Sequence, residues 1–157
     1  MDQTEYLDTV RRMIEIELEA MSFYRLAAQQ FVAESTSFHF DLLADEELEH
    51  AREFYLLYPP GELPDFDTLV ANWSSGKPTA SLSDRLAGCA EAEALKMALH
   101  MEKKVESDLA ELLGRVATPA ARQVIAKNLE STHGHFLLIK QDLEGRRQEA
   151  STPEATG

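Results

Sequence analysis

Apolar side chains recur every three or four positions in four stretches of the chain, which is the spacing of one buried face on an α-helix. The first predicted helix runs from a capping box at Asp2 and Glu5 to about residue 33. The second begins after a Glu-Ser-Thr-Ser turn at residues 34–37 and runs to about Tyr58. The Pro-Pro-Gly sequence at residues 59–61 ends it, because proline cannot continue a helix.

The third predicted helix starts at a serine cap, Ser81 or Ser83, and runs to about Gly114. The fourth starts at Thr118-Pro119, a cap followed by a first-turn proline, and ends near Gly145. Residues 59–82 form a connection rich in Pro, Gly and Ser, in which residues 69–73 predict one short packed turn. Such a long connection lets the third helix lie parallel or antiparallel to the second.

The predicted fold class is therefore all-α, an antiparallel four-helix bundle with a long crossover between its second and third helices. The bundle occupies residues 1–145, with the crossover at 59–82, and residues 146–157 form a polar tail that we expect to be frayed. A length of 157 residues suits one domain with a sizeable core.

The net charge of −13 disfavours nucleic acid and anionic membranes as partners. No apolar run approaches 18 residues, so no membrane span is expected. The acidic, polar N-terminus argues against a secretory signal. Cys89 is the only cysteine, which excludes an internal disulfide and favours a reducing cytoplasm.

Charged residues interrupt the apolar faces of the predicted helices. In the second helix Glu47 and His50 are three residues apart, so their side chains leave neighbouring points on one face. Glu130 and His133 repeat this spacing in the fourth helix. A single Glu falls within the apolar stripe of each remaining helix, at Glu17 and Glu102. A carboxylate and an imidazole that converge on one spot are a metal-ligand pair.

The spacing of these residues places them at one depth. The first predicted turn is nearly equidistant along the chain from Glu17 and from the Glu47/His50 pair. The last predicted turn is likewise nearly equidistant from Glu102 and from the Glu130/His133 pair. In antiparallel hairpins this equality brings all six side chains to one level, roughly 20 Å from the turns. Four carboxylates would balance two divalent cations, whereas an empty buried cluster would be costly. The competing interpretation is a solvated helix face with chance spacing, and we expect His39, His100 and His135 at the surface or at helix caps.

A Glu from each of two helices plus Glu-x-x-His from two others is the di-iron arrangement of four-helix bundles. On these motifs, and on Glu17-x-x-Ala-x-x-Phe-Tyr24, the chain resembles the ferritin-like superfamily and its rubrerythrin-like branch, over about residues 5–145. The resemblance implies two iron ions, with manganese or zinc as possible substitutes. One ion would be bound by Glu17, Glu47 and His50. The other ion would be bound by Glu102, Glu130 and His133. Glu47 and Glu130 would bridge the ions, and Tyr24 would contact a ligand.

Three departures from the family are visible. Val105 stands where rubrerythrins usually carry a further carboxylate, which puts peroxidase efficiency in doubt. No paired-cysteine rubredoxin module is present, so the resemblance implies a separate electron donor. Leu48 stands where bacterioferritin has its haem-ligating Met, so we expect no haem.

The resemblance favours an oxidoreductase in which the metal pair reduces hydrogen peroxide or oxygen in oxidative-stress defence. The alternative is an iron-binding or ferroxidase protein for storage or delivery, without a dedicated organic substrate. A third interpretation is a bundle that uses metal only as a structural staple. The expected assembly is a homodimer, and neither nucleic acid nor membrane is an expected partner.

Overall fold

The computed structural model describes residues 1–32 and 34–151 and, within them, consists of α-helices without a strand. The helices are α1 (Gln3–Gln30), α2 (Thr36–Tyr55), α3 (Phe66–Ser74), α4 (Lys77–Leu86), α5 (Glu91–Arg115) and α6 (Pro119–Ser151). The prediction of an all-α fold is confirmed, and the four predicted helices correspond to the four longest, α1, α2, α5 and α6.

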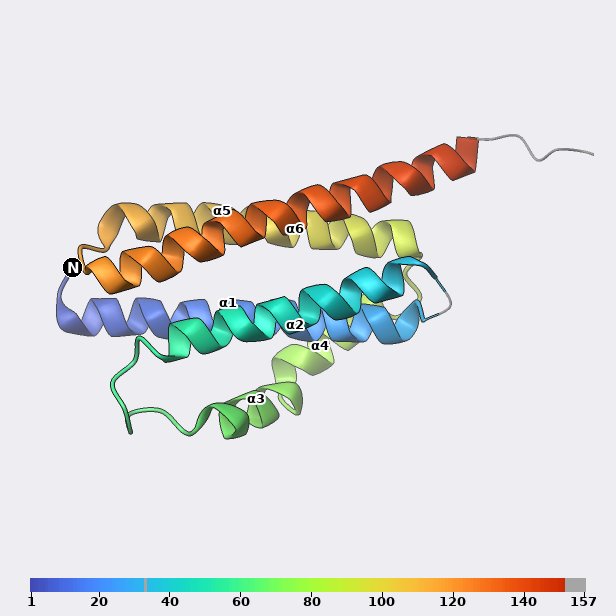
Figure 1. Ribbon diagram of the computed structural model, residues 1–157. Helices are drawn as coiled ribbons and strands as arrows, with labels where there is room; N and C mark the ends of the chain where they lie inside the picture. Colours follow the sequence, from blue (N-terminus) through green and yellow to red (C-terminus); the bar gives the residue numbers. More distant parts are fainter. Residues whose placement is uncertain (33, 152–157) are drawn as a thin grey trace, which may run out of the picture.

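The four long helices lie side by side as two hairpins (Figure 1). The chain runs along α1 and returns along α2, then crosses back to the other end through α3 and α4, which pack against the outer side of α1. It runs along α5 and returns along α6, so that α5 points the same way as α2. The crossover thus decides which faces of the two hairpins meet.

Local sequence signals account for some of the helix ends. The Asp2 carboxylate accepts a hydrogen bond from the backbone N–H of Glu5 at 2.8 Å, and the Glu5 carboxylate accepts one from the N–H of Asp2 at 3.4 Å. The predicted capping box is therefore confirmed. The helix α2 ends at Tyr55, shortly before the two prolines that ended it in the prediction.

The third predicted helix is wrong at its start. Ser81 and Ser83 lie inside α4, and the chain leaves helical geometry between Leu86 and Glu91. Gly88 has a φ of 76° there, a left-handed backbone conformation that glycine adopts without strain. The predicted short turn at residues 69–73 belongs to the full helix α3.

The fourth predicted helix ends too early, because α6 continues past Gly145 to Ser151. Residues 146–151 had been predicted to belong to a frayed tail. The rest of that tail, residues 152–157, lies outside the described residues.

The apolar core consists of two clusters, one toward each end of the long helices. One contains Phe23, Phe40, Leu95 and Ile139, and the other contains Ile14, Phe54, Leu109 and Ile125, each with further apolar neighbours. In every long helix a short stretch between the two clusters carries buried polar side chains. None of the helices within the described residues is long and apolar enough to cross a bilayer.

Candidate metal centre

A layer of buried polar side chains divides the core at mid-height. Its members come from all four long helices, and each is at most 7% exposed. They are Glu17, Glu47, His50, Glu102, Asn128, Thr132 and His135. Burying so many ionisable groups is costly unless they bind one another or a cation.

Two sets of ligand atoms meet in this layer. The first set is Glu17, Glu47 and His50, and the second is Glu47, Glu102 and His135. Within each set the ligand atoms lie within 4.8 Å of one another. Carboxylate oxygens with one imidazole nitrogen are ligands that suit iron, manganese and zinc.

Glu47 belongs to both sets through different oxygens. Its Oε2 lies 3.4 Å from His50 Nδ1, and its Oε1 lies 2.7 Å from His135 Nδ1. The two imidazole rings stack with their centroids 5.6 Å apart. Glu47 is therefore the residue that the two sets share, with one oxygen facing each histidine.

Several buried atoms of this layer have no hydrogen-bond partner within the described residues. They are both carboxylate oxygens of Glu17, Oε1 of Glu47, Nδ1 of His135 and Oγ1 of Thr132. Although Glu47 Oε1 and His135 Nδ1 are close, they are not aligned for a hydrogen bond. Unpaired buried polar atoms cost free energy, and a bound cation would satisfy the carboxylate and imidazole atoms together.

The environment makes two of the three carboxyl groups harder to ionise than usual. Burial raises the pKa of Glu17 well above its ordinary value, and the charge of Glu47 raises it further. Burial and the same charge raise the pKa of Glu102. Burial also opposes ionisation of Glu47, but its contacts with Glu17, His135 and His50 outweigh this and lower its pKa. Glu47 is thus the ionised carboxylate of the metal-free cluster.

Both histidines are cationic in the metal-free protein. Burial favours neutral His50, but its contacts with Glu17 and Glu47 outweigh this and raise the pKa of His50 to about 10. Burial also favours neutral His135, but its contacts with Glu102 and Glu47 raise the pKa of His135 to about 11. Metal ligands must lose these protons, so metal binding competes with protons at the same atoms.

Tyr24 contacts the cluster from α1. Its hydroxyl donates a hydrogen bond of 2.5 Å to Oε1 of Glu102, and its ring stacks on Phe40. Burial, together with the charges of Glu102 and Glu47, raises the pKa of Tyr24 well above its ordinary value. The tyrosine therefore holds one carboxylate of the cluster in place.

The prediction for α6 placed the wrong pair in the layer. Glu130 and His133 are exposed, and the His133 side chain retains 61% of its accessible surface. His133 lies 3.5 Å from the Glu106 carboxylate, on the outside of the α5/α6 hairpin. The histidine in the layer is His135, which was expected at the surface and is only 4% exposed. The residue three positions before it is Thr132, so α6 supplies one histidine and no carboxylate.

The physical reason is the rotation of α6 about its axis. A shift of two residues turns a helix by about 200° but moves it only about 3 Å along its axis. The depth argument therefore could not separate residues 130 and 133 from residues 132 and 135. The signal that could have done so is the pair of isoleucines Ile125 and Ile139, which lie on the buried face with His135.

A half-exposed carboxylate, Glu46, orients His135 from the outside. It precedes the shared Glu47 on α2, and its Oε2 contacts Nε2 of His135. If Nε2 carries the proton and donates it to Glu46, the lone pair of Nδ1 faces Glu47 and Glu102. Glu46 thereby selects the tautomer of His135 that can bind a cation.

Replacing Glu46 by glutamine should weaken metal binding about 10- to 100-fold, the usual cost of losing a partner of a metal-bound histidine. Competition with a chelator of known affinity measures this loss. Glu49→Gln is the matched control, because Glu49 is exposed on the same helix and, among the described residues, its ion pair is with Arg52 at the surface. Equal losses in both variants would show that overall charge, not the contact with His135, sets the affinity.

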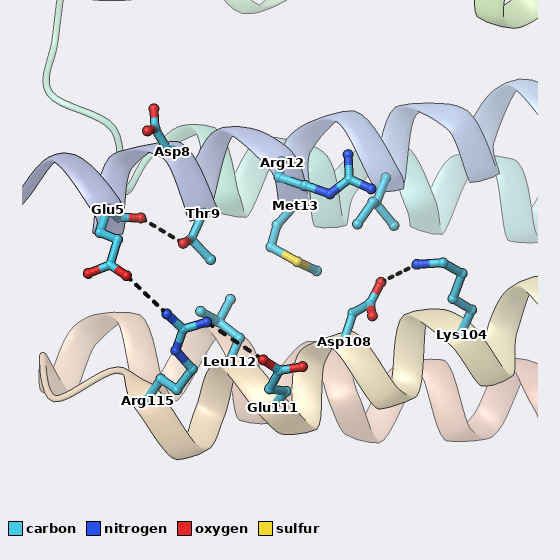
Figure 2. A pocket seen from close by; sticks show the side chains of 11 residues that line it. Glu5, Asp8, Thr9, Arg12, Met13, Lys104, Asp108, Glu111, Leu112 and Arg115 are labelled. Carbon is cyan, nitrogen blue, oxygen red and sulfur yellow. Dashed lines mark hydrogen bonds and ion pairs between the residues drawn. The ribbon is translucent and has the colours of Figure 1, made fainter. Parts of the chain in front are cut away.

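A separate groove of about 420 Å³ lies between α1 and α5, toward the N-terminal end of α1. Figure 2 shows that charged side chains cross it. Arg115 pairs with Glu5 at 3.3 Å and with Glu111 at 3.6 Å, and Lys104 pairs with Asp108 at 2.7 Å. These pairs satisfy one another, and the groove contains no histidine. The polar layer is therefore the stronger candidate site.

Comparison with known proteins gives no match: no family model, no curated protein and no solved structure is similar to this chain. The function of the protein is accordingly inferred from the geometry of the polar layer.

Proposed function

We propose that this protein is a ferritin-like four-helix bundle that holds two iron ions and reduces hydrogen peroxide or oxygen. The observation that carries the proposal is the orientation of Glu47, whose two oxygens face two separate sets of ligand atoms. Each oxygen of Glu47 faces a different histidine, so one carboxylate could contact a cation in each set. The rubrerythrin-like spacing of Glu17, Glu47 and His50 supports the same function.

The ligand set differs from the one that the resemblance implied. Glu17 and His50 would hold one ion, Glu102 and His135 the other, and Glu47 would bridge them. Two ferrous ions would supply the two electrons that reduce a peroxide. Metal binding would release the protons that these ligands hold, and neighbouring residues would orient the ligands. Tyr24 would hold Glu102, and Glu46 would hold His135.

The apolar clusters on both sides of the layer would exclude bulk water from the ions. A low-dielectric environment strengthens the interaction of the carboxylates with the cations. The residues that would bind the ions include no electron donor. The reductant would therefore be a separate molecule.

The first experiment is metal analysis of protein purified from iron-replete cells, followed by titration of the metal-free protein with ferrous ion. We expect about two ions per chain for the wild type. Glu47→Gln should lose the paired binding, because one ligand is removed from both ions. Glu49→Gln, exposed on the same helix, should bind like the wild type. Wild-type protein that takes up no ferrous ion would overturn the proposal.

Rapid mixing of the ferrous protein with peroxide tests the reaction itself. We expect oxidation faster than that of free ferrous ion in the same buffer, and repeated turnover when a reductant is supplied. Two bound ions that are oxidised by oxygen without such turnover would instead favour the ferroxidase alternative.

A further inference from the structure

Thr132 is buried in the polar layer without a polar partner. It is 1% exposed, and its Oγ1 has no hydrogen-bond partner within the described residues. A buried hydroxyl usually finds one, so this group needs an explanation. It lies three positions before His135 on the same face of α6, as Glu47 lies three positions before His50 on α2. Relative to its histidine, Thr132 thus occupies on α6 the position that the shared carboxylate Glu47 occupies on α2.

The protein ligands leave room for another anion. Each set provides one histidine, one carboxylate of its own and one oxygen of Glu47. Three donors do not complete the coordination of a divalent ion such as iron or manganese, which takes additional oxygen ligands. The three carboxylates Glu17, Glu47 and Glu102 also leave one positive charge of two divalent cations unbalanced. The half-exposed Glu46 lies behind His135 and offers no oxygen to either set.

We propose that Thr132 forms part of a binding position for a small carboxylate anion, which bridges the two metal ions in place of a fourth glutamate. The threonine hydroxyl donates a hydrogen bond to this anion, and the anion supplies the missing negative charge. The inference rests on the proposed two-metal site. The anion would be an exchangeable ligand of the metal ions, at a position where a glutamate of the chain would be a permanent one.

Acetate is the probe, and protein loaded with two cobalt(II) ions provides the readout, because the visible spectrum of cobalt responds to its coordination. Titration of the wild type with acetate at constant ionic strength should change the spectrum with saturation, and chloride should not. Thr132→Val should weaken acetate binding about 3- to 10-fold, the usual loss for one hydrogen bond. Thr132→Glu supplies the carboxylate from the chain and should abolish the response to acetate.

Thr36→Val is the matched control. Thr36 is also buried with an unpaired Oγ1, but it lies at the start of α2, far from the layer along that helix. This variant should bind acetate like the wild type. If Thr132→Glu does not fold, the comparison of Thr132→Val with Thr36→Val still decides the result.

A wild-type spectrum that does not respond to acetate would overturn the inference, as would equal acetate affinity in Thr132→Val and the wild type. Cobalt stoichiometry separates this failure from a failure of the proposed function. Two bound ions without a response to acetate would remove only the anion position, whereas absence of paired cobalt binding would remove the two-metal site.

Discussion

His135→Ala should abolish binding of one of the two metal ions, whereas His133→Ala should leave both bound. His135 offers Nδ1 to the second ligand set and is buried, while His133 is exposed and faces Glu106. Loss of a ligand should cost more than the 10- to 100-fold that is typical for partners of metal-bound histidines. Metal titration with elemental analysis measures the number of bound ions in each variant.

The two substitutions form a matched pair, because they remove the same side chain two positions apart on α6. The exposed substitution, His133→Ala, should change the free energy of unfolding by no more than about 0.5 kcal/mol. If His133→Ala lost an ion and His135→Ala retained both, the sequence-based pair Glu130 and His133 would be the correct one. The rotation of α6 in the structure would then be contradicted.

The metal-free protein should lose stability as the pH rises from about 6.5 to 10. The pKa values of His50 and His135 are raised to about 10 and about 11, from 6.5 in the unfolded chain. Between these values the folded protein holds protons that the unfolded chain has released, so the free energy of unfolding falls with pH. The raised pKa values of Glu17 and Glu102 act in the same direction.

Each proton held only by the folded protein contributes about 1.4 kcal/mol per pH unit, so the two histidines together should cost on the order of 5 kcal/mol between pH 7 and 9. Glu47 has the opposite effect, but only in acid, because its pKa is lowered. Urea unfolding in the presence of a chelator measures the curve. The double variant with His50→Gln and His135→Gln should show a much flatter dependence.

The metal-loaded protein provides a second comparison. Its histidines are neutral and its carboxylates ionised when they bind cations, so the folded state no longer holds the extra protons. Stability should then not fall between pH 6.5 and 9 at saturating metal. A metal-free protein whose stability is constant over this range would show that the layer is not the tightly coupled cluster described above.

The sequence alone predicted the four long helices and part of the candidate site. The capping box at Asp2 and the prolines after Tyr58 are local signals, because they depend on backbone groups only a few residues away. Glu17 and the Glu47/His50 pair could be predicted because the apolar residues around them repeat with one clear period. The break at Gly88 was missed because the apolar spacing continues across it, from Leu82 and Leu86 in α4 to Leu95 in α5.

Only the tertiary structure decided which face of α6 enters the layer. That helix carries both a Glu-x-x-His and a Thr-x-x-His sequence, and its apolar residues are spread widely enough to allow either face. The choice depends on the packing of Ile125 and Ile139 into the two apolar clusters. Burying these isoleucines brings His135 inward and leaves His133 in solvent, since two residues rotate a helix by about 200°.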